Sequence, residues 1–244
     1  MKTSSKLVFF GTEDFSLPSL KALVEHGFNV VAVVTKPDTP RGRSKQLIAP
    51  VVKSYAESAG IPVYQPSKLD DIYSELVSLG ADAAILVSYG KLLPQRTLDV
   101  FNPIGVINVH PSLLPKYRGP APIEAAIVNG DAMTGISIMR LTLGMDEGPV
   151  FAQMTIPLDG TETRPTLTAS LASAGAAFLA ETLPPILENK LEPVLQQNID
   201  VSYTSLLTKE MGILDPLTDN AYVLERKVRA YLGYPKTRRS EEHT

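Results

Sequence analysis

The chain has 244 residues, of which 44% are hydrophobic, and can therefore bury one sizeable core, alone or with a small appendage. Its formal net charge of −3 gives no whole-protein attraction to nucleic acid or membranes, so a polyanionic partner would need a local basic patch. It contains no cysteine, which excludes disulfides and thiolate metal sites. We find no signal-like segment and no apolar run of transmembrane length, and expect a cytoplasmic protein with no membrane partner.

Strand-like and helix-like patterns alternate along the first third of the chain. The predicted strands are residues 7–10, 28–34, 61–64 and 83–87, and the predicted helices are residues 17–25, 50–58 and 70–79. A polar loop is expected from residue 35 to 47. Such alternation is typical of βαβ units on a largely parallel, twisted sheet with helices on both faces. Ligands of such sheets bind beyond the carboxyl ends of the strands.

The apolar run 104–107 predicts a further buried strand, which leads directly into Asn108 and His110. Residues two apart on a strand point to the same face, about 6.6 Å from each other, so these side chains should project side by side. Pro111 biases His110 toward an extended backbone and ends the strand. An amide and an imidazole at the end of a buried strand indicate a binding or catalytic site.

The pattern changes from about residue 134. Two strands, 136–143 and 150–156, are expected to form an antiparallel hairpin around the loop 144–148. A long helix follows over residues 167–183 and is expected to end at Pro184 and Pro185. A last helix is predicted over residues 219–232. Its expected apolar stripe consists of Ala221, Leu224, Val228 and Tyr231.

His110 is the histidine best placed for catalysis, because the other two lie at a helix end and near the carboxyl terminus. Asp146 lies between two glycines, which allow its loop to approach a ligand closely. A carboxylate orients an imidazole, and an Asn amide can donate to a developing oxyanion. A lone histidine or aspartate in such places is more often structural. Together they fit acyl transfer better than phosphoryl or hydride transfer, and no metal-ligand cluster or phosphate loop is present.

Three motifs resemble the signature of the 10-formyltetrahydrofolate-dependent formyltransferases: Asn108-Val109-His110, Ser112-Leu113-Leu114-Pro115 with Arg118-Gly119, and Gly144-Met145-Asp146. Residues 10–15 and 36–43 are most similar to the branch of this family that formylates the methionine on initiator tRNA. The resemblance extends from residue 7 to about 236. It implies a Rossmann-like formyltransferase fold with a catalytic domain over residues 1–200. Residues 201–238 would be a linker and helix leading to a C-terminal β-barrel domain that this chain lacks.

The resemblance also implies roles for single residues. Asn108 and His110 would polarise the formyl oxygen, while Asp146 would hold His110 in a productive state and help take the proton from the attacking amine. The co-substrate would be 10-formyltetrahydrofolate, with no metal, and the protein a monomer. Two segments would line the folate site, namely Ser88-Tyr89-Gly90 and Ser112-Leu113-Leu114-Pro115.

Residues 36–46 carry four positive side chains against one negative, a net charge of +3. Such a loop is usually only a solvated surface. By resemblance to the tRNA enzymes it would reach the acceptor arm of the tRNA, with Arg41, Arg43 and Lys45 as the binding residues and Arg43 at the position expected to matter most. Phosphate contacts of this kind supply salt-dependent affinity rather than sequence reading.

Other interpretations stay open at this point. Pro111 stands where the tRNA enzymes more often have a small residue, and related formyltransferases that act on nucleotide-sugar amines or purine precursors share the central signature. A folate-binding protein without turnover is a third possibility, although Asn108, His110 and Asp146 are all intact.

Residues 239–244 have the sequence encoded by a common sequencing adapter. We therefore expect them to be non-native, with the natural gene continuing past about Arg238; the alternative is a charged, frayed tail.

Overall fold

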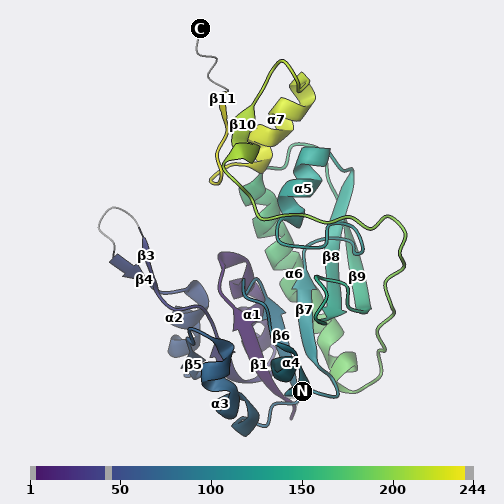
Figure 1. The fold of residues 1–244 in the computed structure, drawn as a ribbon. Coiled ribbons are helices and arrows are strands. Elements are labelled where there is room, and N and C mark those ends of the chain that lie inside the picture. Colours follow the sequence, from purple (N-terminus) through teal and green to yellow (C-terminus); the bar gives the residue numbers. More distant parts are fainter. Residues whose placement is uncertain (1–3, 42–45, 240–244) are drawn as a thin grey trace.

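A seven-stranded mixed sheet forms the centre of the molecule (Figure 1). The structure is a computed structural model, and it describes residues 4–41 and 46–239. The strand order is β5-β2-β1-β6-β7-β8-β9; the first five strands are parallel, and β8 and β9 are antiparallel to their neighbours. The strands are β1 Lys6–Gly11, β2 Asn29–Val34, β5 Val63–Tyr64, β6 Ala83–Val87, β7 Val106–His110, β8 Met133–Arg140 and β9 Val150–Pro157. The predicted α/β class, largely parallel with an antiparallel C-terminal portion, is confirmed.

Helices cover both faces of this sheet, also as predicted. One face packs against α1 (Leu17–Glu25), α2 (Val51–Ser58), α5 (Pro122–Asn129) and α6 (Arg164–Leu187). The other face packs against the 3-10 helix η2 (Leu69–Ile72), α3 (Tyr73–Ser78) and α4 (Gln95–Asp99). Because side chains alternate along a strand, Ile107 and Val109 of β7 belong to the first apolar cluster and Val106 belongs to the second. Asn108 and His110 therefore share the face of Val106.

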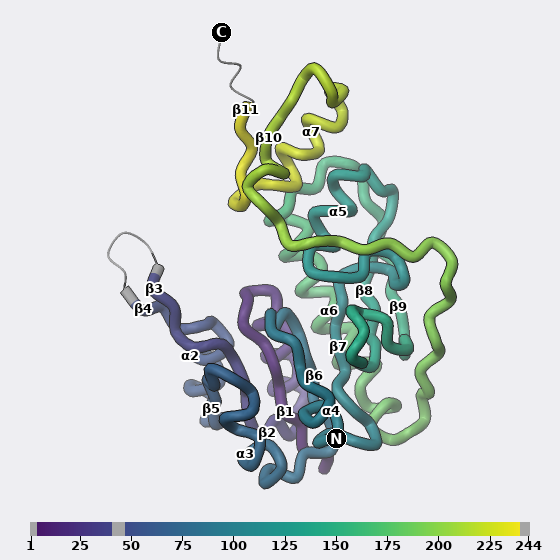
Figure 2. The backbone as a smooth tube through the Cα atoms, in the orientation of Figure 1, coloured from purple at the N-terminus to yellow at the C-terminus, as the bar shows by residue number. Residues whose placement is uncertain are grey.

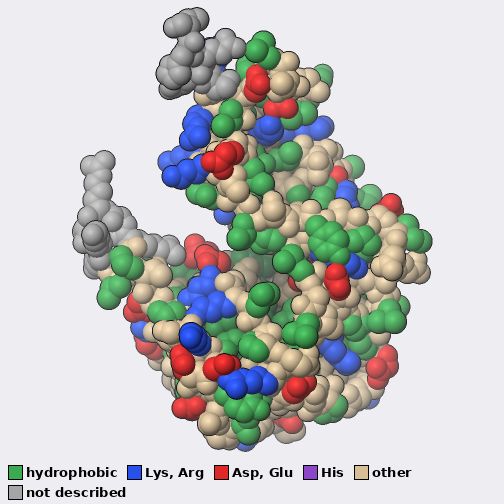
Figure 3. Space-filling view, in the orientation of Figure 1, with side chains coloured by type: hydrophobic (Ala, Val, Ile, Leu, Met, Phe, Trp, Pro, Cys, Tyr) green, Lys and Arg blue, Asp and Glu red, His purple; other side chains and the backbone are tan. Residues whose placement is uncertain are grey.

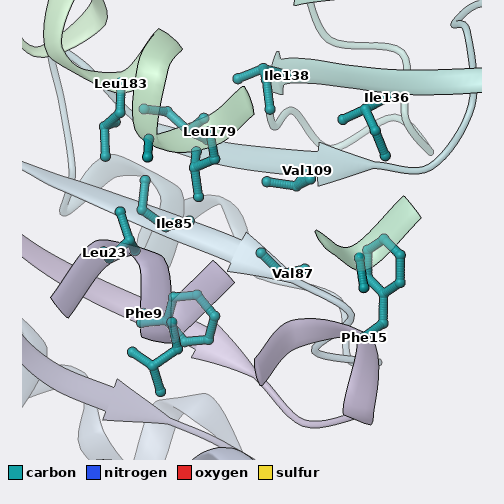
Figure 4. Close-up of a cluster of buried hydrophobic side chains, with 14 of the residues drawn as sticks. Phe9, Phe15, Leu23, Ile85, Val87, Val109, Ile136, Ile138, Leu179 and Leu183 are labelled. Atoms are coloured by element: carbon teal, nitrogen blue, oxygen red, sulfur yellow. The ribbon is translucent and has the colours of Figure 1, made fainter. Parts of the chain in front are cut away.

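The helix α6 is the main support of the first face. Figure 4 shows Leu179 and Leu183 directed at the sheet residues Ile85, Val109 and Ile138, and all five side chains are at most 2% exposed. By length and mean hydropathy α6 could cross a membrane, contrary to the expectation that no segment of the chain is apolar enough. Half of its most apolar window is buried inside the protein, so packing in this core accounts for its composition.

The prediction that Pro184 and Pro185 end the long helix is wrong, because α6 continues through both to Leu187. Each proline lacks an N–H and removes one backbone hydrogen bond from the helix. Beyond them, Ile186 and Leu187 are only 2% and 9% exposed and pack in the first cluster. Burial of a large aliphatic side chain contributes roughly 1.5–3 kcal/mol, which offsets the missing bonds.

The expected polar loop 35–47 is instead an antiparallel ribbon of β3 (Thr39–Arg41) and β4 (Gln46–Ile48). Pairing within the ribbon satisfies backbone groups that a free loop would leave to water. At its base, the Asp38 carboxylate accepts hydrogen bonds from Gln65 Nε2 at 2.7 Å and Lys53 Nζ at 2.9 Å. The Gln65 amide and then the Lys53 ammonium lower the pKa of Asp38. Arg43 and Lys45, expected to bind tRNA, lie outside the described residues.

The C-terminal part forms a small unit at the end of the molecule beyond α5 (Figure 1). It contains the 3-10 helix η3 (Glu210–Gly212), β10 (Ile213–Leu214), α7 (Ala221–Ala230) and β11 (Arg238–Arg239). The strand β11 pairs in parallel with β10, a pairing that the sequence analysis did not predict. The apolar stripe expected on α7 is only partly buried: Tyr231 is 7% exposed, whereas Val228 is 40% exposed. Residues 240–244 of the suspected tail lie outside the described residues.

Replacing Ile186 with alanine tests whether burial maintains α6 beyond its prolines. We expect Ile186→Ala to lower the free energy of unfolding by about 2–5 kcal/mol, because it leaves a cavity in the core. Leu217, which is 82% exposed, provides the control, and Leu217→Ala should change stability by less than about 0.5 kcal/mol. Urea unfolding measures both variants, and equal losses would contradict this account.

Candidate active site

The strand β7 presents an amide and an imidazole to one side of the sheet. The prediction that Asn108 and His110 lie at the carboxyl end of a buried strand, which ends before Pro111, is confirmed, because β7 ends at His110. Asn108 pairs with Leu86 and Met139 of the neighbouring strands, and His110 pairs with Ser137. The backbone of Asn108 is therefore paired on both sides and that of His110 on the β8 side. The two side chains are 6% and 5% exposed.

Asp146 reaches these two residues from the loop between β8 and β9. Its Oδ1 accepts a hydrogen bond from Asn108 Nδ2 at 3.5 Å, and its Oδ2 lies 3.6 Å from His110 Nδ1. Asp146 itself has a left-handed backbone, with φ of 51°. Such a conformation is costly for a residue other than glycine and persists only where the surroundings enforce it. The three residues selected from the sequence thus meet at one point.

A backbone amide holds the Asp146 carboxylate in this place. Gly119 N–H donates to Asp146 Oδ2 at 2.8 Å. Gly119 has φ of 103°, and a Cβ added there would lie 2.6 Å from the carbonyl oxygen of Thr204. No other residue fits this position without displacing its neighbours. The Arg118-Gly119 part of the sequence motif therefore has a structural meaning, which is to anchor the carboxylate.

The other nitrogen of His110 is held by Tyr117. Nε2 of His110 lies 2.9 Å from the Tyr117 carbonyl oxygen, which can only accept, so Nε2 carries the proton and donates it. Tyr117 is left-handed, with φ of 59°, and its hydroxyl donates to Asp131 at 2.8 Å while accepting from Asn129 at 2.8 Å. Burial and the hydrogen bond to Asp131 raise the pKa of Tyr117.

This arrangement defines what the imidazole can do. With Nε2 committed to a carbonyl, only Nδ1 of His110 faces the Asp146 carboxylate and the open side of the site. A neutral ring of this tautomer would turn a lone pair toward a carboxylate, which is repulsive. The contact is attractive when the pair carries one additional proton. His110 and Asp146 can therefore share and move a proton beside the Asn108 amide.

The Ser112–Pro115 segment, expected to line the folate site, is a turn packed on β8. Its polar groups are largely used within the protein: Ser112 Oγ donates to the Lys116 carbonyl at 2.6 Å, and Leu114 N–H donates to Ser137 Oγ at 3.1 Å. Gln153 Nε2 donates to the Leu114 carbonyl at 2.8 Å. The Leu113 side chain lies against Gly135 of β8, and Pro115 completes the turn. Sequence reasoning did not identify Ser137 or Gln153.

The Ser88-Tyr89-Gly90 segment lies directly after β6 on the same sheet edge. The Ser88 carbonyl accepts from Thr12 N at 3.2 Å, and the Tyr89 carbonyl accepts from Thr12 Oγ1 at 3.1 Å. The Tyr89 side chain is fully buried against Phe10, and burial raises its pKa to about 12. The phenol therefore stays protonated and lies in the core. Gly90 follows with φ of 72°, and the end of the Lys36 side chain occupies the space that a Cβ at Gly90 would need.

A cavity of about 210 Å³ lies on the same face of β7 as the catalytic candidates. Val106, two residues before Asn108, forms part of its wall, together with Leu141 and Leu143 of the loop that leads to Asp146. Arg140 also lines it, and its Nε atom is buried without a hydrogen-bond partner among residues 4–41 and 46–239. The wall combines these apolar side chains with the polar residues Gln95, Asp99, Asn102 and Thr142, which is the usual mixture in a site for a small organic ligand. Sequence reasoning did not identify it.

An extended segment, residues 194–204, closes the site from outside; we call it the strap. Figure 2 shows it rising alongside β9 and then crossing the molecule toward the C-terminal unit. It begins with a bridge between Val194 and Val150. Further along, Ser202 Oγ accepts from Tyr117 N at 2.9 Å, and Thr204 N donates to the Arg118 carbonyl at 2.7 Å. No sequence motif pointed to the strap.

Within the described part of the chain, no group of three or more His, Asp or Glu side chains could hold a metal ion. The geometry is that of a site for proton transfer and oxyanion stabilisation next to a cavity.

Comparisons with known proteins place this geometry in a family. The model of the family described as "Formyl transferase" matches residues 5–183, which is most of the chain. The chain belongs to the formyl transferase family. A methionyl-tRNA formyltransferase of Dictyoglomus turgidum is 45% identical over 86% of this chain and 67% of its own length. That of Halorhodospira halophila is 42% identical over 96% of this chain and 76% of its own length.

Solved structures of other formyl transferases share the fold at lower identity. A sugar 3N-formyl transferase, crystallised in the presence of dTDP and 5-N-formyl-THF, matches with a TM-score of 0.71 at 20% identity. The match covers 93% of the present chain and 79% of the sugar formyl transferase. Glycinamide ribonucleotide transformylase 1 of Symbiobacterium toebii has a TM-score of 0.65 at 20% identity, over 79% of this chain and 94% of its own. These likenesses concern the fold alone.

The anchoring of Asp146 by Gly119 can be tested in this formyl transferase. We expect Gly119→Ala to reduce turnover about 100-fold, because the added Cβ meets Thr204 and displaces the N–H that holds the carboxylate. Gly60→Ala is the matched control, since Gly60 also has a positive φ, of 70°, but has open space around its Cβ position. Activity and melting temperature are measured for both. Equal loss of activity in the two variants would contradict the anchoring role.

Proposed function

We propose that this formyl transferase moves the formyl group of 10-formyltetrahydrofolate to the amino group of methionine on initiator tRNA, in translation initiation. The meeting of Asn108, His110 and Asp146 at one point carries the proposal. It is supported by relatives named methionyl-tRNA formyltransferase, among them one of Dehalococcoides mccartyi that is 40% identical over 94% of this chain and 73% of its own length. Such a reaction belongs to the cytoplasm, and we propose that a single copy of the chain holds a complete catalytic centre.

The three residues account for the proton and charge movements of formyl transfer. As the amine nitrogen bonds to the formyl carbon, negative charge develops on the formyl oxygen, and the Asn108 amide donates a hydrogen bond to it. Nδ1 of His110, the ring nitrogen that does not donate to the Tyr117 carbonyl, supports the same charge when it carries a proton. Asp146 accepts the proton that the amine loses. When the bond from the formyl carbon to the folate N10 breaks, that nitrogen takes up a proton, and formylated amine and tetrahydrofolate result.

The cavity beside β7 is our proposed site for the folate ring system. Its lining by Val106, Leu141 and Leu143 suits a flat heteroaromatic ring, and the polar residues Gln95, Asp99 and Asn102 can meet the polar edge of such a ring. Because Val106 and Asn108 share one face of the strand, a ring in the cavity would direct its attached formyl group toward Asn108. The turn Ser112–Pro115 is bound through Leu114 to Ser137, the residue of β8 that pairs with His110.

The ribbon of β3 and β4 is our proposed contact for the tRNA. Figure 3 shows a notch between the ribbon and the C-terminal unit, with Lys and Arg side chains gathered on that unit above the notch. Exposed cations there include Lys236 and Arg238. Positive charge beside a notch suits a phosphate backbone, whose contacts supply most of the affinity. Arg41, Arg43 and Lys45 remain our proposed tRNA-binding residues.

The reaction and its acceptor are tested together. Tetrahydrofolate release from 10-formyltetrahydrofolate labelled in the formyl group is measured with and without methionyl initiator tRNA. We expect release to depend on the charged tRNA and the label to appear on the methionine. If tetrahydrofolate release is the same with and without the charged tRNA, the proposed acceptor is overturned, and a nucleotide-sugar amine or a purine precursor is favoured as the acceptor.

Asp146→Asn separates a catalyst from a folate-binding protein without turnover. We expect turnover to fall by about 10²–10⁴-fold, because the amide cannot accept the proton of the amine, while binding of 10-formyltetrahydrofolate persists. Calorimetric titration measures binding. Glu181→Gln is the matched control, since Glu181 is exposed on α6 and its carboxylate faces solvent. Full activity of Asp146→Asn would contradict the assigned role.

Arg43→Ala tests the ribbon. We expect KM for charged tRNA to rise and the salt dependence of tRNA binding to become weaker, because one phosphate contact is lost. KM for 10-formyltetrahydrofolate serves as the internal control and should stay constant. An unchanged KM for the tRNA would argue against this role of Arg43.

A further inference from the structure

We infer that Gln196 of the strap is a positioning residue for Asp146, acting together with the buried Arg118. This inference rests on the proposed function only for its kinetic consequences, because the contacts themselves are properties of the protein. Gln196 lies 50 positions along the chain from Asp146, and its side-chain amide does not touch the carboxylate. The Gln196 amide instead binds the backbone carbonyl of Asp146.

The amide of Gln196 is fully used. Its Nε2 donates to the carbonyl of Asp146 at 2.7 Å and to the carbonyl of Gly148 at 2.8 Å. Its Oε1 accepts from Arg118 Nε at 3.0 Å and from Arg118 Nη2 at 2.8 Å. The Nε2 group donates both of its hydrogens to carbonyl oxygens, and Oε1 accepts both hydrogen bonds from the Arg118 guanidinium. Exchanging Nε2 and Oε1 would break all four bonds, so only one orientation of the amide is possible.

Arg118 is itself held from several directions. Only 5% of the residue is exposed, so its charge needs partners within the protein. Besides Gln196, its Nη1 donates to the Tyr203 hydroxyl at 2.9 Å, and the Tyr203 hydroxyl donates to Glu147 at 2.8 Å. The Arg118 backbone pairs with Ser202 and Thr204. The strap thus fixes Arg118, and Arg118 fixes the amide that holds the Asp146 loop.

The left-handed conformation of Asp146 explains why such support is needed. A non-glycine residue in this region costs of order 1–3 kcal/mol and relaxes when its surroundings allow. The Gly119 N–H holds one end of Asp146, its carboxylate, and Gln196 holds the other end, its carbonyl. Without Gln196, the loop 144–148 would lose two of its hydrogen bonds to the rest of the protein. The carboxylate would then move relative to His110 and Asn108.

Two substitutions test this inference. Gln196→Leu removes all four bonds, whereas Gln196→Glu keeps an acceptor for Arg118 but cannot donate to the carbonyls of Asp146 and Gly148. We expect both to lower kcat by about 10- to 100-fold, with KM for the folate changed less than threefold and with the melting temperature retained in Gln196→Glu. Gln197, the exposed neighbour on the strap, provides matched controls in Gln197→Leu and Gln197→Glu, which should keep the kcat of the wild type.

A spectroscopic measurement separates this inference from the proposed function. In protein labelled with ¹⁵N-histidine, the imidazole nitrogen shifts of His110 should change in both Gln196 variants, while those of His26 stay constant. Unchanged His110 shifts, or a wild-type kcat in both Gln196 variants, would overturn the positioning role. Changed shifts in a protein that does not formylate charged tRNA would support the role of Gln196 and overturn the proposed acceptor.

Discussion

The hydrogen bond from the Gly119 amide to the Asp146 carboxylate is the constraint on which the site depends. It joins the turn after β7 to the loop after β8, and it puts the carboxylate oxygen 3.6 Å from His110 Nδ1. Both partners have positive φ angles, which glycine adopts readily, whereas Asp146 keeps this conformation only because its surroundings hold it. The remainder of the site can be understood as the set of contacts that make this pairing the lowest-energy state.

The mixed sheet supplies the frame for that pairing. Because β6 and β7 are parallel, their carboxyl ends lie at the same edge of the sheet. The antiparallel strand β8 then pairs with β7 on its other side. Burial of β7 between two neighbours and two apolar clusters fixes Asn108 and His110 to a narrow range of positions. Rigid backbone of this kind suits a centre that stabilises developing charge, because its dipoles need not reorganise during the reaction.

The strap adds a dependence between distant parts of the chain. Residues 194–204 support the turn 115–121 and, through Gln196, the loop 144–148. Loss of strap contacts would therefore disturb the catalytic centre before it disturbed the core. The C-terminal unit to which the strap leads is joined to the same core through Ala230 and Tyr231.

The sequence by itself determined the βαβ alternation, most strand and helix positions, and the choice of Asn108, His110 and Asp146, because these follow from local periodicity and from motifs with a chemical meaning. Two predictions from the sequence were wrong. The helix α6 does not end at its prolines, because the residues beyond them are buried. The segment 35–47 is not a loop, because its two short strands pair with each other. The sequence contained no sign of Ser137, Gln153 or Gln196. An isolated serine or glutamine has no pattern, and its partners are carbonyl groups that every residue possesses. Only the tertiary structure decided which of them meet, because packing determines which donor lies beside each carbonyl.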